Sequence, residues 1–141
     1  MTEPLRMGVV GVGRMGALHA ETLAATDAID VVAVVDARPD VAGRVAASIG
    51  AVDYQSLAAL SERDDITGWL IATPTTTHPA GVDVALEAVH HVLCEKPLAI
   101  DQSERERLGA LAAARGTEMH VGFWRRIAPP RESARKAVVE P

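Results

Sequence analysis

Short runs rich in β-branched residues alternate with alanine-rich runs of helical periodicity along most of the chain. This alternation is typical of a parallel sheet whose consecutive strands are joined by helices packed on its faces. We therefore predict an α/β fold, a doubly wound parallel sheet of the Rossmann type. The expected strands cover residues 7–12, 29–36, 52–54, 66–73, 91–95 and 118–123.

The helices between these strands carry recognisable end signals. Gly50 and Gly116 each follow a periodic apolar run and predict helix ends closed by a left-handed residue. Ser103 and Glu106 have the spacing of a capping box and predict the start of the helix that Gly116 closes. The second, fourth and fifth strands are nearly continuous apolar runs, so we expect both faces of each to be covered.

Length and charge narrow the classes of function. The 141 residues suffice for one domain and are too few for two of ordinary size. A net charge of -5 without a long run of Lys or Arg argues against nucleic acid or an anionic membrane as partner. Cys94 is the only cysteine, and the sequence shows neither a signal peptide nor an apolar run of about 20 residues. We expect a cytoplasmic protein.

The run GVGRMG at residues 11–16 directly follows the first predicted strand and opens the first predicted helix. This is the context that a dinucleotide-binding fingerprint requires. Gly11 would make the tight turn, Gly13 would let the backbone approach a pyrophosphate, and Gly16 would allow close helix packing. Arg14 and Met15 stand in the first helical turn, whose unpaired N–H groups favour phosphate. We predict that all five residues bind a dinucleotide cofactor.

Asp36 ends the second predicted strand, where a carboxylate can accept hydrogen bonds from the adenosine ribose. The same charge would repel a 2′-phosphate, which favours NAD over NADP. Arg38, two residues later, can instead receive that phosphate, so NADP stays open as a second cofactor. The alternative interpretation of Asp36 is a solvated residue at a strand end.

The loop TPTTTH at residues 73–78 follows the fourth predicted strand, at the edge of the sheet where ligands bind in α/β folds. Thr73, Pro74, Thr75 and His78 are candidates for the nicotinamide end of the cofactor site. An ordinary polar loop, with His78 as the N-terminal residue of a helix, explains the same residues equally well.

The adjacent His90 and His91 are candidate metal ligands by residue type alone. No third ligand stands at a suitable spacing. We interpret them as the exposed end of a helix and the first residue of a strand, and we predict no metal site.

Four stretches together resemble the N-terminal domain of the Gfo/Idh/MocA family of sugar and polyol oxidoreductases, with the inositol 2-dehydrogenase branch as the nearest match. They are GVVGVGRMGALHAETLA, VVAVVDARPD, IATPTTTHPAGVDVALEAVHHVLCEKPLA and VGFWRRIAPP. The resemblance extends over residues 5 to 130 and keeps the family's order. The HVLCEKPLA stretch, residues 91–99, is its most specific part.

In that family the lysine of the Glu-Lys-Pro motif lies beside the nicotinamide and assists proton transfer at the reacting hydroxyl or carbonyl. The resemblance gives this catalytic role to Lys96, together with contacts to cofactor and substrate. It implies that Glu95 holds the lysine and the cofactor in place, and that the Lys96–Pro97 bond is cis. It also implies that Arg125 reaches the substrate.

The chain departs from the family pattern at a helix end. Val89 and His90 replace the usual Gly-Lys pair before the fifth strand. A β-branched residue fits a left-handed cap poorly, so we expect that turn to have a different shape.

Family members continue into a second domain, an open and mostly antiparallel sheet that covers the nicotinamide and supplies an Asp and a His to the catalytic group. We assign residues 1–124 to the dinucleotide-binding domain and 125–141 to a linker and the start of a truncated C-terminal region. His120 lies inside the predicted sixth strand, out of place for that catalytic histidine.

Two functions follow. The first is the cofactor-binding half of an NAD(P)-dependent oxidoreductase, which exchanges hydride with a secondary alcohol of a polyol or sugar such as myo-inositol. The alternative is a non-catalytic dinucleotide-binding module or truncated pseudoenzyme. In either case, an uncovered apolar face near Phe123 and Trp124 would favour self-association.

Overall fold

The structure, a computed structural model, describes residues 3–122. In chain order the elements are β1 (Leu5–Val10), α1 (Arg14–Ala24), β2 (Ile29–Val35), α2 (Pro39–Ile49), β3 (Val52–Tyr54), α3 (Leu57–Ser61), β4 (Gly68–Ile71), the 3₁₀ helix η1 (Thr75–Thr77), α4 (His78–Glu87), β5 (His91–Glu95), α5 (Gln102–Arg115) and β6 (Met119–Gly122). The strands form one sheet in the order β3-β2-β1-β4-β5-β6, and every neighbouring pair is parallel. This confirms the predicted Rossmann-type sheet.

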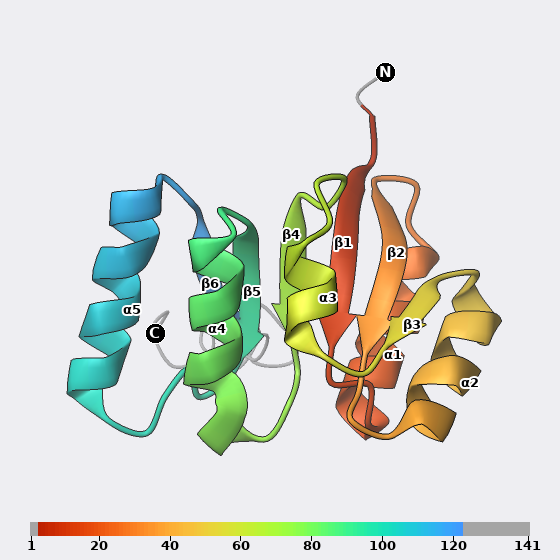
Figure 1. The fold of residues 1–141 in the computed structure, drawn as a ribbon, viewed down its shortest axis with the longest axis horizontal. Helices are drawn as coiled ribbons and strands as arrows, with labels where there is room; N and C mark the ends of the chain where they lie inside the picture. The colour runs from red at the N-terminus through yellow and green to blue at the C-terminus, as the bar shows by residue number, and fades with distance from the viewer. Residues whose placement is uncertain (1–2, 123–141) are drawn as a thin grey trace, which may run out of the picture.

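Helices cover the sheet from both sides. In Figure 1, α3, α4 and α5 lie in front of the sheet, and α1 lies behind it. Each side has its own apolar core. Trp69 and Leu86 belong to the core under α4 and α5, and Val34 and Ala20 to the core under α1 and α2. The strands run in the same direction, so their carboxyl ends lie along one edge, the lower edge in Figure 1. The chain order reverses between β1 and β4, which is where α/β sheets bind ligands.

The helix ends at Gly50 and Gly116 are confirmed, because both residues are left-handed, with φ of 74° and 67°. The turn at Val89 corrects a prediction. Val89 is also left-handed, with φ of 61°, so the turn does not take a different shape. The Val89 N–H donates to Leu86 O and the His90 N–H to Ala85 O, at 3.0 and 2.9 Å, which is the full Schellman pattern. The hydrogen bonds of the cap outweigh the steric preference of the side chain.

The start of α5 also differs from the prediction. The helix begins at Gln102 with Asp101 as its N-cap residue, so Ser103 and Glu106 do not form a capping box. The Arg105 guanidinium donates to Ala99 O and Ile100 O, both at 2.9 Å. These bonds tie the first turn to the segment before it.

The fifth strand is covered less completely than predicted. Val92 and Cys94 are buried under α4 and α5, but Leu93, on the opposite face, is 36% exposed. The strand therefore alternates, and the expectation that both its faces are covered is wrong. Residues 123–141, which include Phe123, Trp124 and Arg125, lie outside the described part of the chain, and so does the apolar face predicted there.

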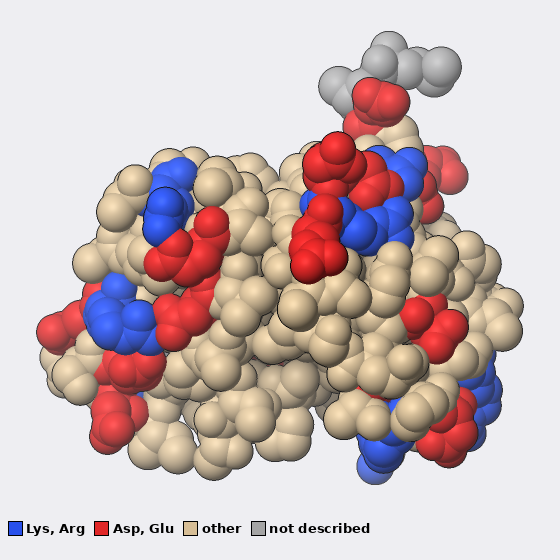
Figure 2. Space-filling view, in the orientation of Figure 1, with Lys and Arg blue, Asp and Glu red and all other residues tan. Residues whose placement is uncertain are grey.

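Surface charges occur in mixed groups on the face shown in Figure 2, where acidic and basic side chains lie side by side between neutral areas. Two ion-pair clusters occur among the described residues. Arg107 contacts Asp83 and Glu104, and Asp65 contacts both Arg6 and Arg63. Among residues 3–122, no helix is both long and apolar enough to cross a membrane.

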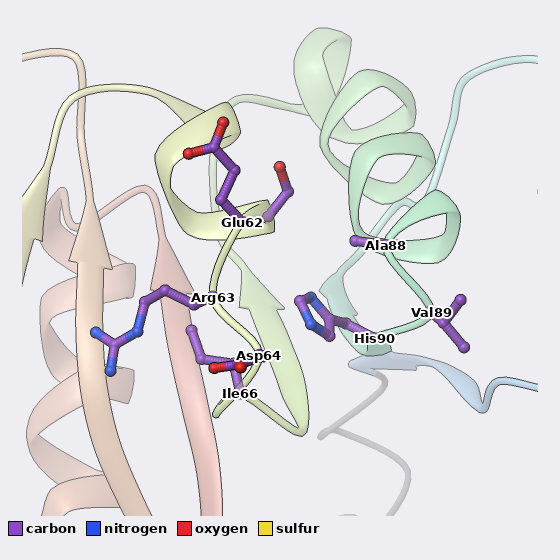
Figure 3. Close-up of a pocket in the computed structure, with 8 residues that line it drawn as sticks. Glu62, Arg63, Asp64, Ile66, Ala88, Val89 and His90 are labelled. Atoms are coloured by element: carbon purple, nitrogen blue, oxygen red, sulfur yellow. The ribbon is translucent and has the colours of Figure 1, made fainter.

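His90 differs from its predicted position as an exposed helix end. The side chain lies at the edge of the sheet opposite the strand carboxyl ends, beside a cavity of about 390 Å³ that also contacts Glu62, Asp64 and Val89 (Figure 3). Its ring packs against Trp69, with 5.8 Å between ring centroids, so the residue is almost fully buried. Burial lowers the pKa of His90, which keeps the ring neutral. His91 begins β5, as predicted.

Candidate cofactor site

The turn after β1 requires glycine at two places. Gly11 has a φ of 80°, and a Cβ atom there would come within 2.8 Å of the backbone nitrogen of Thr73. A Cβ atom on Gly16 would lie 1.7 Å from Gly11 O, so α1 can pack on the turn only because Gly16 has no side chain. These contacts hold the start of α1 against the ends of β1 and β4.

The first turn of α1 is open to a ligand. Gly13 is the N-cap residue, and no side chain caps the helix. Among residues 3–122, a Cβ atom on Gly13 would meet only Arg38 Nη2, at 3.6 Å, and the next two residues, Arg14 and Met15, are exposed. Free N–H groups and the positive end of the helix dipole suit an anion that approaches the backbone over Gly13. The structure therefore fits a pyrophosphate here.

Asp36 follows β2 at the same edge, and its side chain is only 8% exposed. The carboxylate accepts hydrogen bonds from the Val12 N–H at 3.1 Å and from the Arg38 N–H at 3.0 Å. The Arg38 guanidinium binds it with both Nε and Nη2, at 2.9 and 3.1 Å. Hydrogen bonds from the Arg38 side chain hold the pKa of Asp36 below its usual value, so the group is ionised at neutral pH. Asp36 is thus no freely solvated strand-end residue.

The loop after β4 contributes its backbone and a buried histidine. His78 begins α4, and its ring lies beneath the loop, 1% exposed. Its Nδ1 is 2.8 Å from Pro97 O and its Nε2 is 2.7 Å from Thr73 O. The ring therefore joins the loop after β4 to the loop after β5. Of the two interpretations of His78, the N-terminal helix residue describes its position.

The other residues of this loop lie closer to the open edge. Pro74 is exposed, and Thr75 is half-buried in η1. Thr73 lies next to Gly11, since a Cβ atom on Gly11 would be 2.8 Å from Thr73 Cγ2. The Thr73 hydroxyl is buried and has no hydrogen-bond partner within residues 3–122. The loop thus places one unpaired hydroxyl next to the glycine turn.

The Glu-Lys-Pro segment ends β5 at the same edge. Lys96 is exposed, and the Lys96–Pro97 bond is cis, as predicted. Glu95 Oε2 accepts from the Lys96 backbone N–H at 3.2 Å, and Glu95 Oε1 lies 2.6 Å from His19 Nε2. The neighbouring Cys94 is buried, and burial raises the pKa of its thiol to about 12, so it stays protonated.

His19 is the site residue that the sequence reasoning missed. It stands on α1, one turn after Gly16, whose close packing brings that side of the helix onto the sheet. The spacing of three residues was the available signal, because residues i and i+3 share a helix face. His19 holds Glu95 and so links the glycine turn's helix to the Glu-Lys-Pro segment.

The predicted site residues within 3–122 thus follow the carboxyl ends of β1, β2, β4 and β5 along one edge. Arg125 lies outside the described residues. The sequence of residues 5–123 matches the model of an oxidoreductase family with an NAD-binding Rossmann fold, the Gfo/Idh/MocA family. The chain belongs to this family.

Curated and solved relatives agree with this assignment. Inositol 2-dehydrogenase of Rhizobium meliloti strain 1021 is 31% identical over 134 residues, which are 95% of this chain and 40% of that protein. Among solved structures, GenD2 from gentamicin A biosynthesis, in complex with NAD, superposes with a TM-score of 0.94 at 32% identity, over 99% of this chain and 40% of GenD2. KijD10, a 3-ketoreductase from Actinomadura kijaniata in complex with NADP, gives 0.92 at 32% identity, over 98% and 44%.

The shares of each chain that align show which part of the relatives this chain resembles. The Gfo/Idh/MocA chain described here spans about 40% of the length of the relatives it matches. That part is the NAD-binding domain of the family. Its cofactor is a nicotinamide dinucleotide, and related structures contain NAD or NADP.

Proposed function

We propose that this domain serves an NAD(P)-dependent oxidoreductase that acts on a secondary alcohol of a polyol or sugar, such as myo-inositol. The observation that carries the proposal is the common position of the glycine turn, Asp36 and Lys96 along one edge of the sheet. The similarity to an inositol 2-dehydrogenase and to a dTDP-3,4-didehydro-2,6-dideoxy-α-D-glucose 3-reductase supports the substrate class.

The residues divide into binding and reacting groups. Gly11, Gly13, Gly16 and the first turn of α1, with Arg14 and Met15, would hold the pyrophosphate. Asp36 would accept hydrogen bonds from the adenosine ribose, and Arg38 would receive a 2′-phosphate where NADP binds. The loop residues Thr73, Pro74 and Thr75 would line the nicotinamide end, with His78 supporting them from below.

Lys96 would carry the proton chemistry. The nicotinamide supplies the hydride acceptor or donor when the cofactor is bound. The Lys96 Nζ would take the proton of the substrate hydroxyl during oxidation and return it to the carbonyl oxygen during reduction. Glu95, held by His19 and by the Lys96 N–H, would fix the backbone from which the lysine extends.

Two assays on the same protein test this proposal. Binding of NADH and NADPH is measured by energy transfer from tryptophan, and turnover by the appearance of NADH from NAD with myo-inositol and a panel of hexoses. Lys96→Ala should lower kcat by about 10²- to 10⁴-fold and weaken NADH binding by a much smaller factor. Lys96→Arg is the matched control, because a guanidinium keeps the charge and cannot give up its proton.

The results separate the two candidate functions. Lys96→Arg should bind cofactor and fail in turnover, as Lys96→Ala does. Equal turnover by wild type and both variants would refute the role of Lys96. Turnover of any of these alcohols by the wild-type chain would rule out the non-catalytic dinucleotide-binding module.

A further inference from the structure

The Asp36 carboxylate has no acceptor site left for a ligand. An ionised carboxylate offers about four lone-pair positions. The Val12 N–H, the Arg38 N–H and two atoms of the Arg38 guanidinium occupy them. A ribose hydroxyl can therefore bind Asp36 only after one of these donors has left.

Arg38 is the donor that can leave. Its side chain is 60% exposed, and within residues 3–122 its only hydrogen-bond partner is Asp36. The Val12 N–H, in contrast, belongs to the buried backbone of the turn. Rotation of the Arg38 side chain would free two acceptor positions on Asp36 and leave the fold unchanged.

The Arg38 guanidinium stands where the adenosine ribose has to lie. It reaches from Asp36 to Gly13, since a Cβ atom on Gly13 would be 3.6 Å from Nη2. In the dinucleotide fold the pyrophosphate approaches this second glycine and the acidic residue receives the ribose, so the ribose lies between the two. The guanidinium bridges the same two points.

A cationic cavity adjoins this position. It has a volume of about 410 Å³ and is lined by Arg14, Arg38 and Arg44, with Glu21 as the one acidic residue of its described lining. Arg14 and Arg44 are exposed. Arginine binds phosphate strongly because its planar fork donates two parallel hydrogen bonds. A phosphate on the 2′-oxygen would enter a region where arginines outnumber carboxylates.

We propose that Arg38 is an internal competitor for Asp36 that makes the site accept both NAD and NADP. NAD has to displace the guanidinium from Asp36 to place its ribose hydroxyls there. NADP meets an Asp36 whose charge Arg38 already neutralises, and its 2′-phosphate gains Arg38 as a partner. Arg38 therefore weakens NAD binding and strengthens NADP binding. This inference rests on the proposed binding of a dinucleotide at this edge.

The test is a pair of fluorescence titrations, with NADH and with NADPH, on wild type and Arg38→Ala. The variant should bind NADH about two- to fivefold more tightly, because an exposed ion pair no longer competes for Asp36. It should bind NADPH about tenfold or more weakly, because a charge-assisted contact to phosphate is lost. Arg38→Gln, which keeps a polar side chain of similar length, should shift both affinities in the same directions.

Arg107→Ala is the matched control. Arg107 also forms an exposed bidentate pair with an aspartate, Asp83, at 2.8 Å for both contacts, but it lies on α5. The Arg107→Ala variant should keep the wild-type ratio of NADPH affinity to NADH affinity. Thermal unfolding of each variant verifies that it is folded. A ratio unchanged in Arg38→Ala, or a loss of affinity for both cofactors, would overturn the inference. Failure of the wild-type protein to bind either cofactor would instead refute the proposed function.

Discussion

Val89 offers a direct test of the energetic argument about helix ends. A left-handed backbone costs an L-residue about 1–2 kcal/mol, and a β-branched side chain belongs at the upper end of that range. Val89 has a φ of 61° and the residue is 56% exposed, so it recovers little by burial. The two other left-handed caps, Gly50 and Gly116, avoid this cost.

Val89→Gly should therefore stabilise the protein. About 2 kcal/mol of strain is relieved, against roughly 0.7 kcal/mol for the greater freedom of glycine in the unfolded chain. The lost contacts of a half-exposed valine subtract about 0.5 kcal/mol. The net gain is about 0.5–1 kcal/mol, which raises Tm by about 2–4 °C for a chain of this size.

Thermal and urea unfolding of wild type and Val89→Gly measure this gain. Val52→Gly is the matched control, because Val52 has a similar exposure, 50%, in the extended strand β3. That control should lose stability, since glycine weakens a strand and relieves no strain there. If Val89→Gly is as unstable as Val52→Gly, the strain at Val89 is negligible and the reasoning fails.

Three further predictions concern other parts of the fold. Gly16→Ala should destabilise the protein by about 2 kcal/mol or more in urea unfolding, because its Cβ would lie 1.7 Å from Gly11 O. Gly43→Ala, in α2, should instead stabilise it by about 0.5–1 kcal/mol, because in the described part of the chain nothing outside the helix's own backbone lies within 4 Å of the added Cβ. Hydrogen bonds from Arg63, with a second contribution from Arg6, hold the pKa of Asp65 well below its unfolded value. Its contribution to stability is therefore complete above about pH 4 and is lost as the pH falls further, so the urea midpoint of Asp65→Asn should fall less between pH 5 and 3 than that of wild type.

Much of the fold follows from local sequence rules. Gly50 and Gly116 end helices because glycine alone takes the left-handed conformation without strain, and both ends were predicted correctly. The alternation of strands and helices predicted a parallel sheet, and all the neighbouring strands are parallel. The start of α5 was predicted wrongly, because the spacing of Ser103 and Glu106 does not by itself decide which residue caps the helix, and the N-cap residue is Asp101.

The site shows the same limit. The position of Asp36 could be predicted from its place after a strand. The two hydrogen bonds from the Arg38 guanidinium to its carboxylate could not, because they depend on a side-chain rotamer that sequence spacing does not fix. The contact between His19 and Glu95 joins residues 76 apart in the chain, and no local rule pairs them. His78 was predicted either to line the nicotinamide end of the cofactor site or to be the N-terminal residue of a helix, and its two bonds to separate loops appear only in three dimensions.

The central claim is that the strand carboxyl edge with the glycine turn and Asp36 binds a nicotinamide dinucleotide. Titration of the wild-type chain with NADH, followed by energy transfer from tryptophan, tests it most directly, with Asp36→Ala as the site variant and Arg107→Ala as the control. Saturable binding that Asp36→Ala weakens and Arg107→Ala leaves unchanged is the predicted result. The absence of saturable binding, or equal affinity in wild type and Asp36→Ala, would contradict the account.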